Sequence, residues 1–119
     1  MDYKTTITGI GEMALDFLEQ QMLIVFNENA PAELKELSVQ HTIASLDKDI
    51  KVGDVVLFGD DSYIVTAVGD EANHTLRSMG HCTFKFTGKD TVQLPGHIEL
   101  SGEKLPTPEV GKPFEILFT

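Results

Sequence analysis

The sequence predicts a small, mainly β protein, an antiparallel barrel or sandwich with two short helices. Short segments rich in Val, Ile, Phe and Thr recur along its 119 residues, and such segments are typical of strands. Gly- and Pro-containing turns separate them at short intervals, which favours a barrel or sandwich. No repeat or linker interrupts the chain, and its length fits one hydrophobic core. We therefore expect residues 1–119 to form a single domain.

Alternation and turn residues place the individual strands. The expected strands cover residues 3–8, 22–26, 38–46, 55–59, 62–68, 81–86 and 90–94, then a segment after Pro95-Gly96, and finally residues 113–118. Residues 11–21 have a helical face, residues 27–37 hold about one helical turn, and residues 69–80 form a short helix that ends at Gly80. The order of the strands in the sheet does not follow from periodicity.

Charge and cysteine content exclude several classes of protein. Nineteen acidic residues against nine basic ones give a formal net charge of −10, which argues against nucleic-acid binding. Cys82 is the only cysteine, so no internal disulfide and no paired-cysteine zinc motif can form. The longest fully apolar run, residues 22–26, is too short to insert into a membrane, and the first residues do not read as a signal peptide. We therefore expect a cytoplasmic protein.

His41 is the first candidate for chemistry, because it lies in line with apolar residues. In an expected strand with a period of two, Val39, His41 and Ile43 share one side,. A buried imidazole without a partner costs about 1–3 kcal/mol, whereas an accessible neutral imidazole has a nitrogen free to attack phosphorus. The pattern leaves both positions open; if His41 is a phosphoryl acceptor, we expect a shallow, dry docking patch of Val39, Thr42 and Ile43 around it.

The other histidines leave alternatives open. His81 follows Gly80 at the start of an expected strand and could assist His41 if the two strands are neighbours. His74 and His97 are expected to be exposed bystanders. A rival hypothesis is a metal site made from His41, His81 and His97, although isolated histidines on separate strands are a weak signal for one.

Several stretches together resemble a known family, the glucitol/sorbitol-specific enzyme IIA component of the bacterial phosphoenolpyruvate:sugar phosphotransferase system. They are "TTITGIG", "QMLIVFNENAPAEL", the strand around His41, "VTAVGDEANHTLRSMGH", "LPG" and "PEVG". No single string is specific, but their order and spacing cover nearly the whole chain.

The resemblance implies a function and its residues. It implies that His41 accepts a phosphoryl group from the phosphohistidine carrier protein and passes it to the IIB domain of a polyol transporter that also has a IIC component. His81 is implied to support the reaction. Ile43 stands where some members have a second histidine, which makes His81 the better candidate for a helper. No cofactor or metal is expected.

Two other readings remain open. One is a non-catalytic barrel that binds or regulates, and the other is a metal-dependent barrel enzyme that uses several histidines. Exposed strand edges also leave open the formation of a homodimer.

Overall fold

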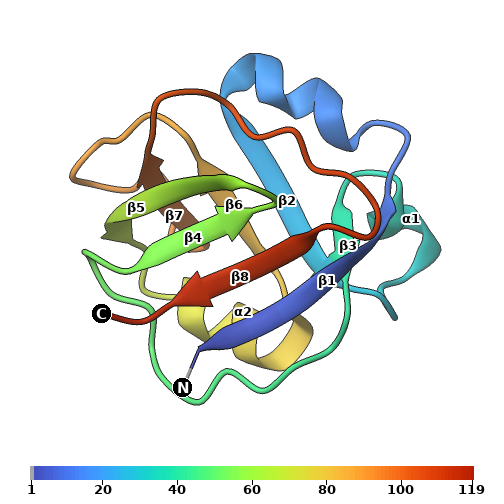
Figure 1. Cartoon of the computed structure of the whole chain (residues 1–119), viewed down its shortest axis with the longest axis horizontal. Helices are drawn as coiled ribbons and strands as arrows, with labels where there is room; N and C mark the ends of the chain where they lie inside the picture. The colour runs from blue at the N-terminus through green and yellow to red at the C-terminus, as the bar shows by residue number, and fades with distance from the viewer. Residues whose placement is uncertain (1) are drawn as a thin grey trace.

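The computed structural model describes residues 2–119 as a closed barrel of eight strands (Figure 1). The mainly β barrel that the sequence predicts is therefore confirmed. The strands are β1 (Tyr3–Ile10), β2 (Met22–Asn27), β3 (Val39–His41), β4 (Val55–Phe58), β5 (Asp61–Val68), β6 (Cys82–Lys85), β7 (His97–Ser101) and β8 (Pro113–Leu117).

The order around the barrel is β1-β3-β2-β6-β7-β5-β4-β8, and β8 closes it by pairing with β1. Six of these pairings are antiparallel, but β2 with β3 and β6 with β7 are parallel. A parallel pair needs a connection that carries the chain back to the starting end. This requirement explains a wrong prediction: residues 90–94 belong to the return connection before β7 and form no strand.

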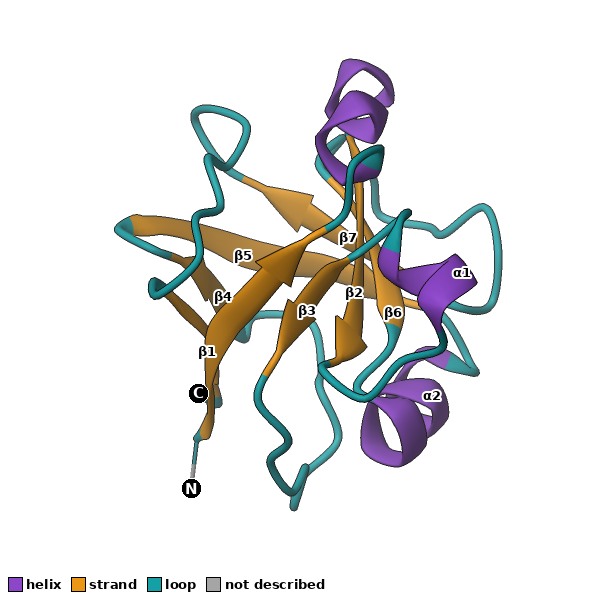
Figure 2. Cartoon of the chain, turned by 90° about the vertical axis from the view of Figure 1, so that its right-hand side faces the viewer, coloured by secondary structure: helices purple, strands orange, loops and turns teal. Residues whose placement is uncertain are grey.

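Three short helical segments accompany the barrel, and each lies where the sequence predicts a helix or a helical turn. They are the 3-10 helix η1 (Ala14–Gln20) and the α-helices α1 (Ala32–Lys35) and α2 (Ala72–Met79). The single turn α1 lies in the connection between the parallel strands β2 and β3. Figure 2 shows α2 near the end of β2 and the start of β6, and it packs against both strands.

The strand around His41 is shorter than predicted. It ends at His41: the Thr42 N–H still donates to the Thr6 carbonyl oxygen at 3.0 Å, but the Thr6 N–H donates to the Thr42 side chain instead of its carbonyl oxygen. Thr42 Oγ1 accepts this hydrogen bond from the Thr6 N–H at 3.0 Å, and the Thr42 carbonyl oxygen lies 2.9 Å from Nδ1 of His41. Residues 42–54 then leave the sheet as an irregular connection.

Aromatic rings fill the barrel. Phe58 and Phe114 stack with their ring centroids 5.1 Å apart, and Phe84 meets Phe58 edge-on at 5.6 Å. Tyr3 packs at the edge of Phe114 with the centroids 6.1 Å apart. All four side chains are at most 1% exposed. Such edge-to-face and offset contacts add to the burial of apolar area, and two of these rings, Tyr3 and Phe114, pack against His41.

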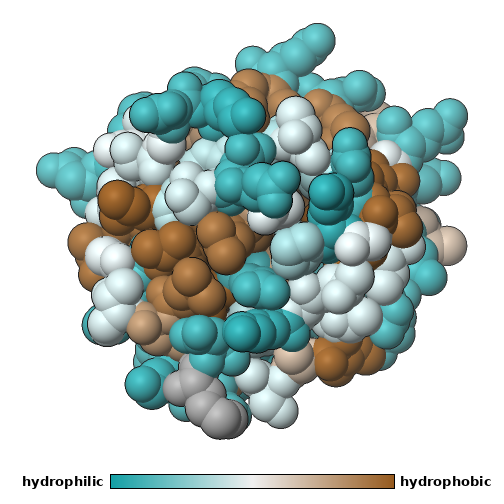
Figure 3. Space-filling model, viewed as in Figure 1, coloured by the Kyte–Doolittle hydropathy of each residue, from teal (hydrophilic) through white to brown (hydrophobic). Residues whose placement is uncertain are grey.

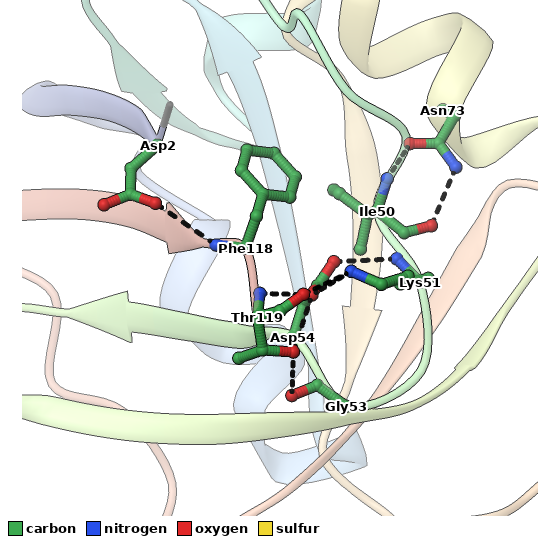
Figure 4. A network of polar contacts seen from close by, with 8 residues as sticks. All are labelled: Asp2, Ile50, Lys51, Gly53, Asp54, Asn73, Phe118 and Thr119. Carbon is green, nitrogen blue, oxygen red and sulfur yellow. Dashed lines mark hydrogen bonds and ion pairs between the residues drawn. The ribbon is translucent and has the colours of Figure 1, made fainter.

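A polar network joins the end of the chain to the start of β4 (Figure 4). The buried Asp54 carboxylate accepts hydrogen bonds from Lys51 N at 2.9 Å, Lys51 Nζ at 3.0 Å and Thr119 N at 3.0 Å. Burial alone would raise the pKa of Asp54, but these bonds and the Lys51 charge hold it below 3.8. These hydrogen bonds thus stabilise the ionised Asp54 carboxylate. The network has a structural role, because it ties the end of the chain, directly after β8, to the start of β4.

The surface is polar with separate apolar patches, as the face in Figure 3 shows. In the described part of the chain, none of the helices has the length and apolar character that crossing a bilayer requires.

Candidate functional site

His41 and His81 meet at one turn, the Gly80–His81 junction between α2 and β6. β3 and β6 are not neighbours, because β2 lies between them. His41 reaches across: its Nε2 lies 2.8 Å from the carbonyl oxygen of Gly80, the residue directly before His81. The neighbouring strands on which the assisting role of His81 was made to depend are therefore not found, and the link between the two histidines runs through the Gly80 backbone.

The His41 ring lies inside the barrel, with no exposed surface. It packs against Phe114 with the ring centroids 4.9 Å apart and against Tyr3 at 6.2 Å. Its Nδ1 lies 2.9 Å from the Thr42 carbonyl oxygen, and its Nε2 is paired with the Gly80 carbonyl oxygen. The expected accessible position of His41 is therefore wrong. The apolar alternation that placed His41 on the same side as Val39 therefore indicates burial in the core.

The two carbonyl partners of His41 compete with its burial. A carbonyl oxygen only accepts, and a neutral imidazole has a single N–H, so only the imidazolium can donate to both oxygens. Burial lowers the pKa of His41, while the bonds to Thr42 and Gly80 and the Glu28 charge act in the opposite direction. In either protonation state, both nitrogens face carbonyl oxygens, so no lone pair is directed at a partner protein.

The predicted docking patch does not form one exposed surface. Val39 has no exposed surface, Thr42 is half-buried and Ile43 is 56% exposed. The strand that would have aligned them ends at His41, so Ile43 belongs to the irregular connection and not to a shared strand face.

His81 has the opposite arrangement. It is half-buried, and its ring stacks on Phe26 with the centroids 4.0 Å apart and an interplanar angle of 13°. Nδ1 lies 3.1 Å from the Val25 carbonyl oxygen, so Nδ1 carries the proton in the neutral ring. Burial lowers the pKa of His81, and the bond to Val25 opposes that shift in part. The neutral tautomer has its lone pair on Nε2.

Gly80 makes the approach of these groups possible. Its φ is +61°, a left-handed conformation that glycine adopts at little cost. A Cβ atom at this position would collide with Oδ1 of Asn27 and lie 2.9 Å from Cε1 of His41. The sequence analysis correctly predicted Gly80 as the end of a helix. The sequence around Gly80 does not indicate its close approach to the side chains of Asn27 and His41, which come from other strands.

The remaining histidines lie elsewhere. His74 is exposed on α2 as expected, but His97 is only 8% exposed, because it begins β7 and pairs with Thr83 of β6. Residues 2–119 contain no group of three or more His, Cys, Asp or Glu side chains placed to hold a metal ion. The rival metal site of His41, His81 and His97 is therefore not assembled.

Comparison with known proteins identifies the family. The family described as the glucitol/sorbitol-specific IIA component of the phosphotransferase system matches residues 2–115. The chain belongs to this family. Glucitol/sorbitol-specific EIIA components of Escherichia coli (strain K12) and Shigella flexneri are each 40% identical over 115 residues, which cover 97% of this chain and 91% of the relative.

A solved structure agrees with the fold. The crystal structure of a phosphotransferase-system IIA component from Enterococcus faecalis V583 superposes with a TM-score of 0.85 and 29% sequence identity, over 97% of this chain and 99% of that one. The chain is thus a phosphotransferase component with a phosphocarrier role, and other components of that system are its partners.

Proposed function

We propose that this chain carries a phosphoryl group on His41, takes it from the phosphohistidine carrier protein and passes it to the IIB domain of a glucitol/sorbitol transporter. Membership of the family, with 40% identity across 97% of the chain, is the observation that carries the proposal. The resemblance implies His41 as the acceptor. Supporting this, His41 and the second implied histidine, His81, meet at one turn.

This assignment requires a structural change, because His41 is closed off in the structure. Its Nε2 must leave the Gly80 carbonyl oxygen before the nitrogen can attack phosphorus. Losing a buried hydrogen bond costs about 1–3 kcal/mol, which the docking of a partner protein can offset. The Gly80–His81 turn is the natural moving part, since it connects α2 to β6 and covers the Nε2 side of the ring.

Phosphorylation in the reconstituted system tests the proposal. The folded chain is incubated with phosphoenolpyruvate, the first enzyme of the system and the carrier protein, and then with the IIB domain. We expect a phosphoryl group that acid removes and that moves on to IIB. His41→Gln should lose the group at residue 41 and slow transfer to IIB about tenfold or more. A folded wild-type chain that takes up no phosphoryl group would contradict the proposal.

One observation favours a second candidate function, a non-catalytic binding or regulatory module. Both nitrogens of His41 are engaged, as in a structural histidine. The same experiment separates the two functions, because a regulatory module would bind the carrier protein without taking up phosphate.

The finer assignments of place and assembly belong to the same proposal. On this proposal the chain lies in the cytoplasm and does not insert into the bilayer. From there it binds the carrier protein and the IIB and IIC components of the transporter. A homodimer stays a prediction, and light scattering coupled to size-exclusion chromatography measures it directly.

A further inference from the structure

The His81 ring is held in one orientation by the barrel. Nδ1 donates to the Val25 carbonyl oxygen of β2 at 3.1 Å, and one face of the ring stacks on Phe26. Nε2 has no hydrogen-bond partner within residues 2–119 and is not one of the buried polar atoms there. The ring therefore presents its lone pair on an accessible atom, whereas the lone-pair positions of His41 are covered.

The backbone of His81 is fixed as well. Its N–H donates to the Thr75 carbonyl oxygen at 3.2 Å, and its own carbonyl oxygen accepts from Thr75 Oγ1 at 2.7 Å. The preceding carbonyl, that of Gly80, is paired with His41. A nucleophile held this way loses little freedom when a donor docks, and such positioning is the main source of catalysis in phosphoryl transfer.

The charges around the two histidines also differ. The Glu28 carboxylate acts on the pKa of His41, whereas burial and the Val25 carbonyl are the two influences on that of His81. A phosphoryl group adds about two negative charges. The nearby Glu28 carboxylate would oppose these charges at His41.

We propose that His81 is itself a phosphoryl acceptor, and that its Nε2 reacts while the barrel is closed, with no movement of His41. This inference rests on the proposed function. His81 reacts in the closed barrel and His41 only after the turn opens, so the two assignments are compatible. In the closed form His41 is a positioning residue, because it holds the carbonyl next to His81.

The transfer balances as a displacement at phosphorus. The Nε2 lone pair forms the new P–N bond, and the P–N bond to the donor phosphohistidine breaks with its electron pair returning to the donor ring. The His81 ring keeps its Nδ1 proton and becomes positively charged, and the Val25 carbonyl oxygen stabilises that proton. Because the proton stays on Nδ1, the ring leaves as a neutral imidazole in the next transfer.

Mapping the phosphoryl group in the full chain tests this inference. Wild type, His41→Gln, His81→Gln and His74→Gln are phosphorylated with phosphoenolpyruvate, the first enzyme and the carrier protein. They are then kept at alkaline pH and mapped by mass spectrometry, and ³¹P NMR distinguishes Nε2 from Nδ1. His74 is the matched control, because it is exposed on α2 and outside the site.

We expect a phosphoryl group on Nε2 of His81 in wild type, in His74→Gln and in folded His41→Gln. His81→Gln should lose it. A group found only on His41, or on Nδ1 of His81, overturns the inference and leaves the proposed function intact. A folded wild-type chain without any phosphoryl group overturns both. Circular dichroism shows whether His41→Gln is folded. If it is not, the position of the phosphoryl group in the wild-type chain still tests the inference.

Discussion

The two histidines at the Gly80–His81 turn occupy opposite environments. His41 has no exposed surface and both nitrogens paired, whereas His81 is half-buried with one nitrogen paired. In the closed barrel of residues 2–119 the same side chain is therefore fully buried and bonded at both nitrogens in one place, and half-buried with one nitrogen unpaired in the other. Burial and the number of partners, rather than residue type, decide what an imidazole can do.

We expect the largest loss of stability from a substitution at Gly80, in the turn on which the environments of both histidines depend. Gly80→Ala places a Cβ against Asn27 and His41 in a left-handed conformation that costs other residues about 1–2 kcal/mol. We expect a total loss of about 3 kcal/mol or more in the free energy of unfolding, because strain and collision add. Urea denaturation measures it.

Gly96→Ala is the matched control for this variant. Gly96 has no atom within 4 Å of the position of an added Cβ, so we expect its midpoint to stay close to that of wild type. Equal midpoints for the two variants would show that the Gly80 turn does not support the barrel.

The next largest effect is the loss of stability when the His41 or the His81 ring is removed. His41→Leu leaves the Gly80 and Thr42 carbonyl oxygens without their partner, and we expect a loss of about 2–4 kcal/mol in the free energy of unfolding. His81→Leu removes one bond at a half-buried site and should cost about 1 kcal/mol or less. Equal losses in urea denaturation would contradict the inference that the closed barrel depends more on the His41 ring than on the His81 ring.

Titration of the histidines gives a smaller, pH-dependent effect. Burial lowers the pKa of His41, His81 and His97 below 6.5 in the folded chain. The unfolded chain therefore binds more protons near pH 6, and the free energy of unfolding should fall as the pH drops below about 6.5. Each histidine contributes a slope of at most about 1.4 kcal/mol per pH unit.

Chemical denaturation between pH 7.5 and 5.0 measures this slope. A variant in which His41 is replaced by Gln should show a shallower one, since one of the three titrating groups is gone. A stability that rises on acidification through this range would mean that the carbonyl partners of His41 outweigh its burial.

The sequence predicted most of the strands, because alternation of apolar residues and turn residues are local signals. The resemblance singled out His41 and His81, but the spacing of the residues did not show that the two are linked. The sequence could not predict which of them is accessible. The pattern of Val39, His41 and Ile43 is compatible with an exposed patch or with the core, and only the ring wall of Tyr3 and Phe114 around His41 decides between them.

Long-range contacts explain the other failures. The parallel pairing of β6 with β7 turns residues 90–94 into a connection. The hydrogen bond from Thr6 to the Thr42 side chain ends β3 early. Each depends on a segment distant in the sequence, which a periodicity of two or of 3.6 residues does not record.

The smallest expected effect concerns Thr75, whose hydroxyl holds the backbone carbonyl of His81 at 2.7 Å. Thr75→Val keeps the shape of the side chain but removes that bond, at a cost of about 1 kcal/mol. If the bond positions the His81 ring, phosphorylation at residue 81 should slow several-fold while the group mapped to His41 is unchanged. Rapid-quench labelling of both residues measures the two rates. An equal fall at both histidines would show that Thr75 supports the fold as a whole, and an unchanged rate at His81 would show that its ring is positioned by Val25 and Phe26 alone.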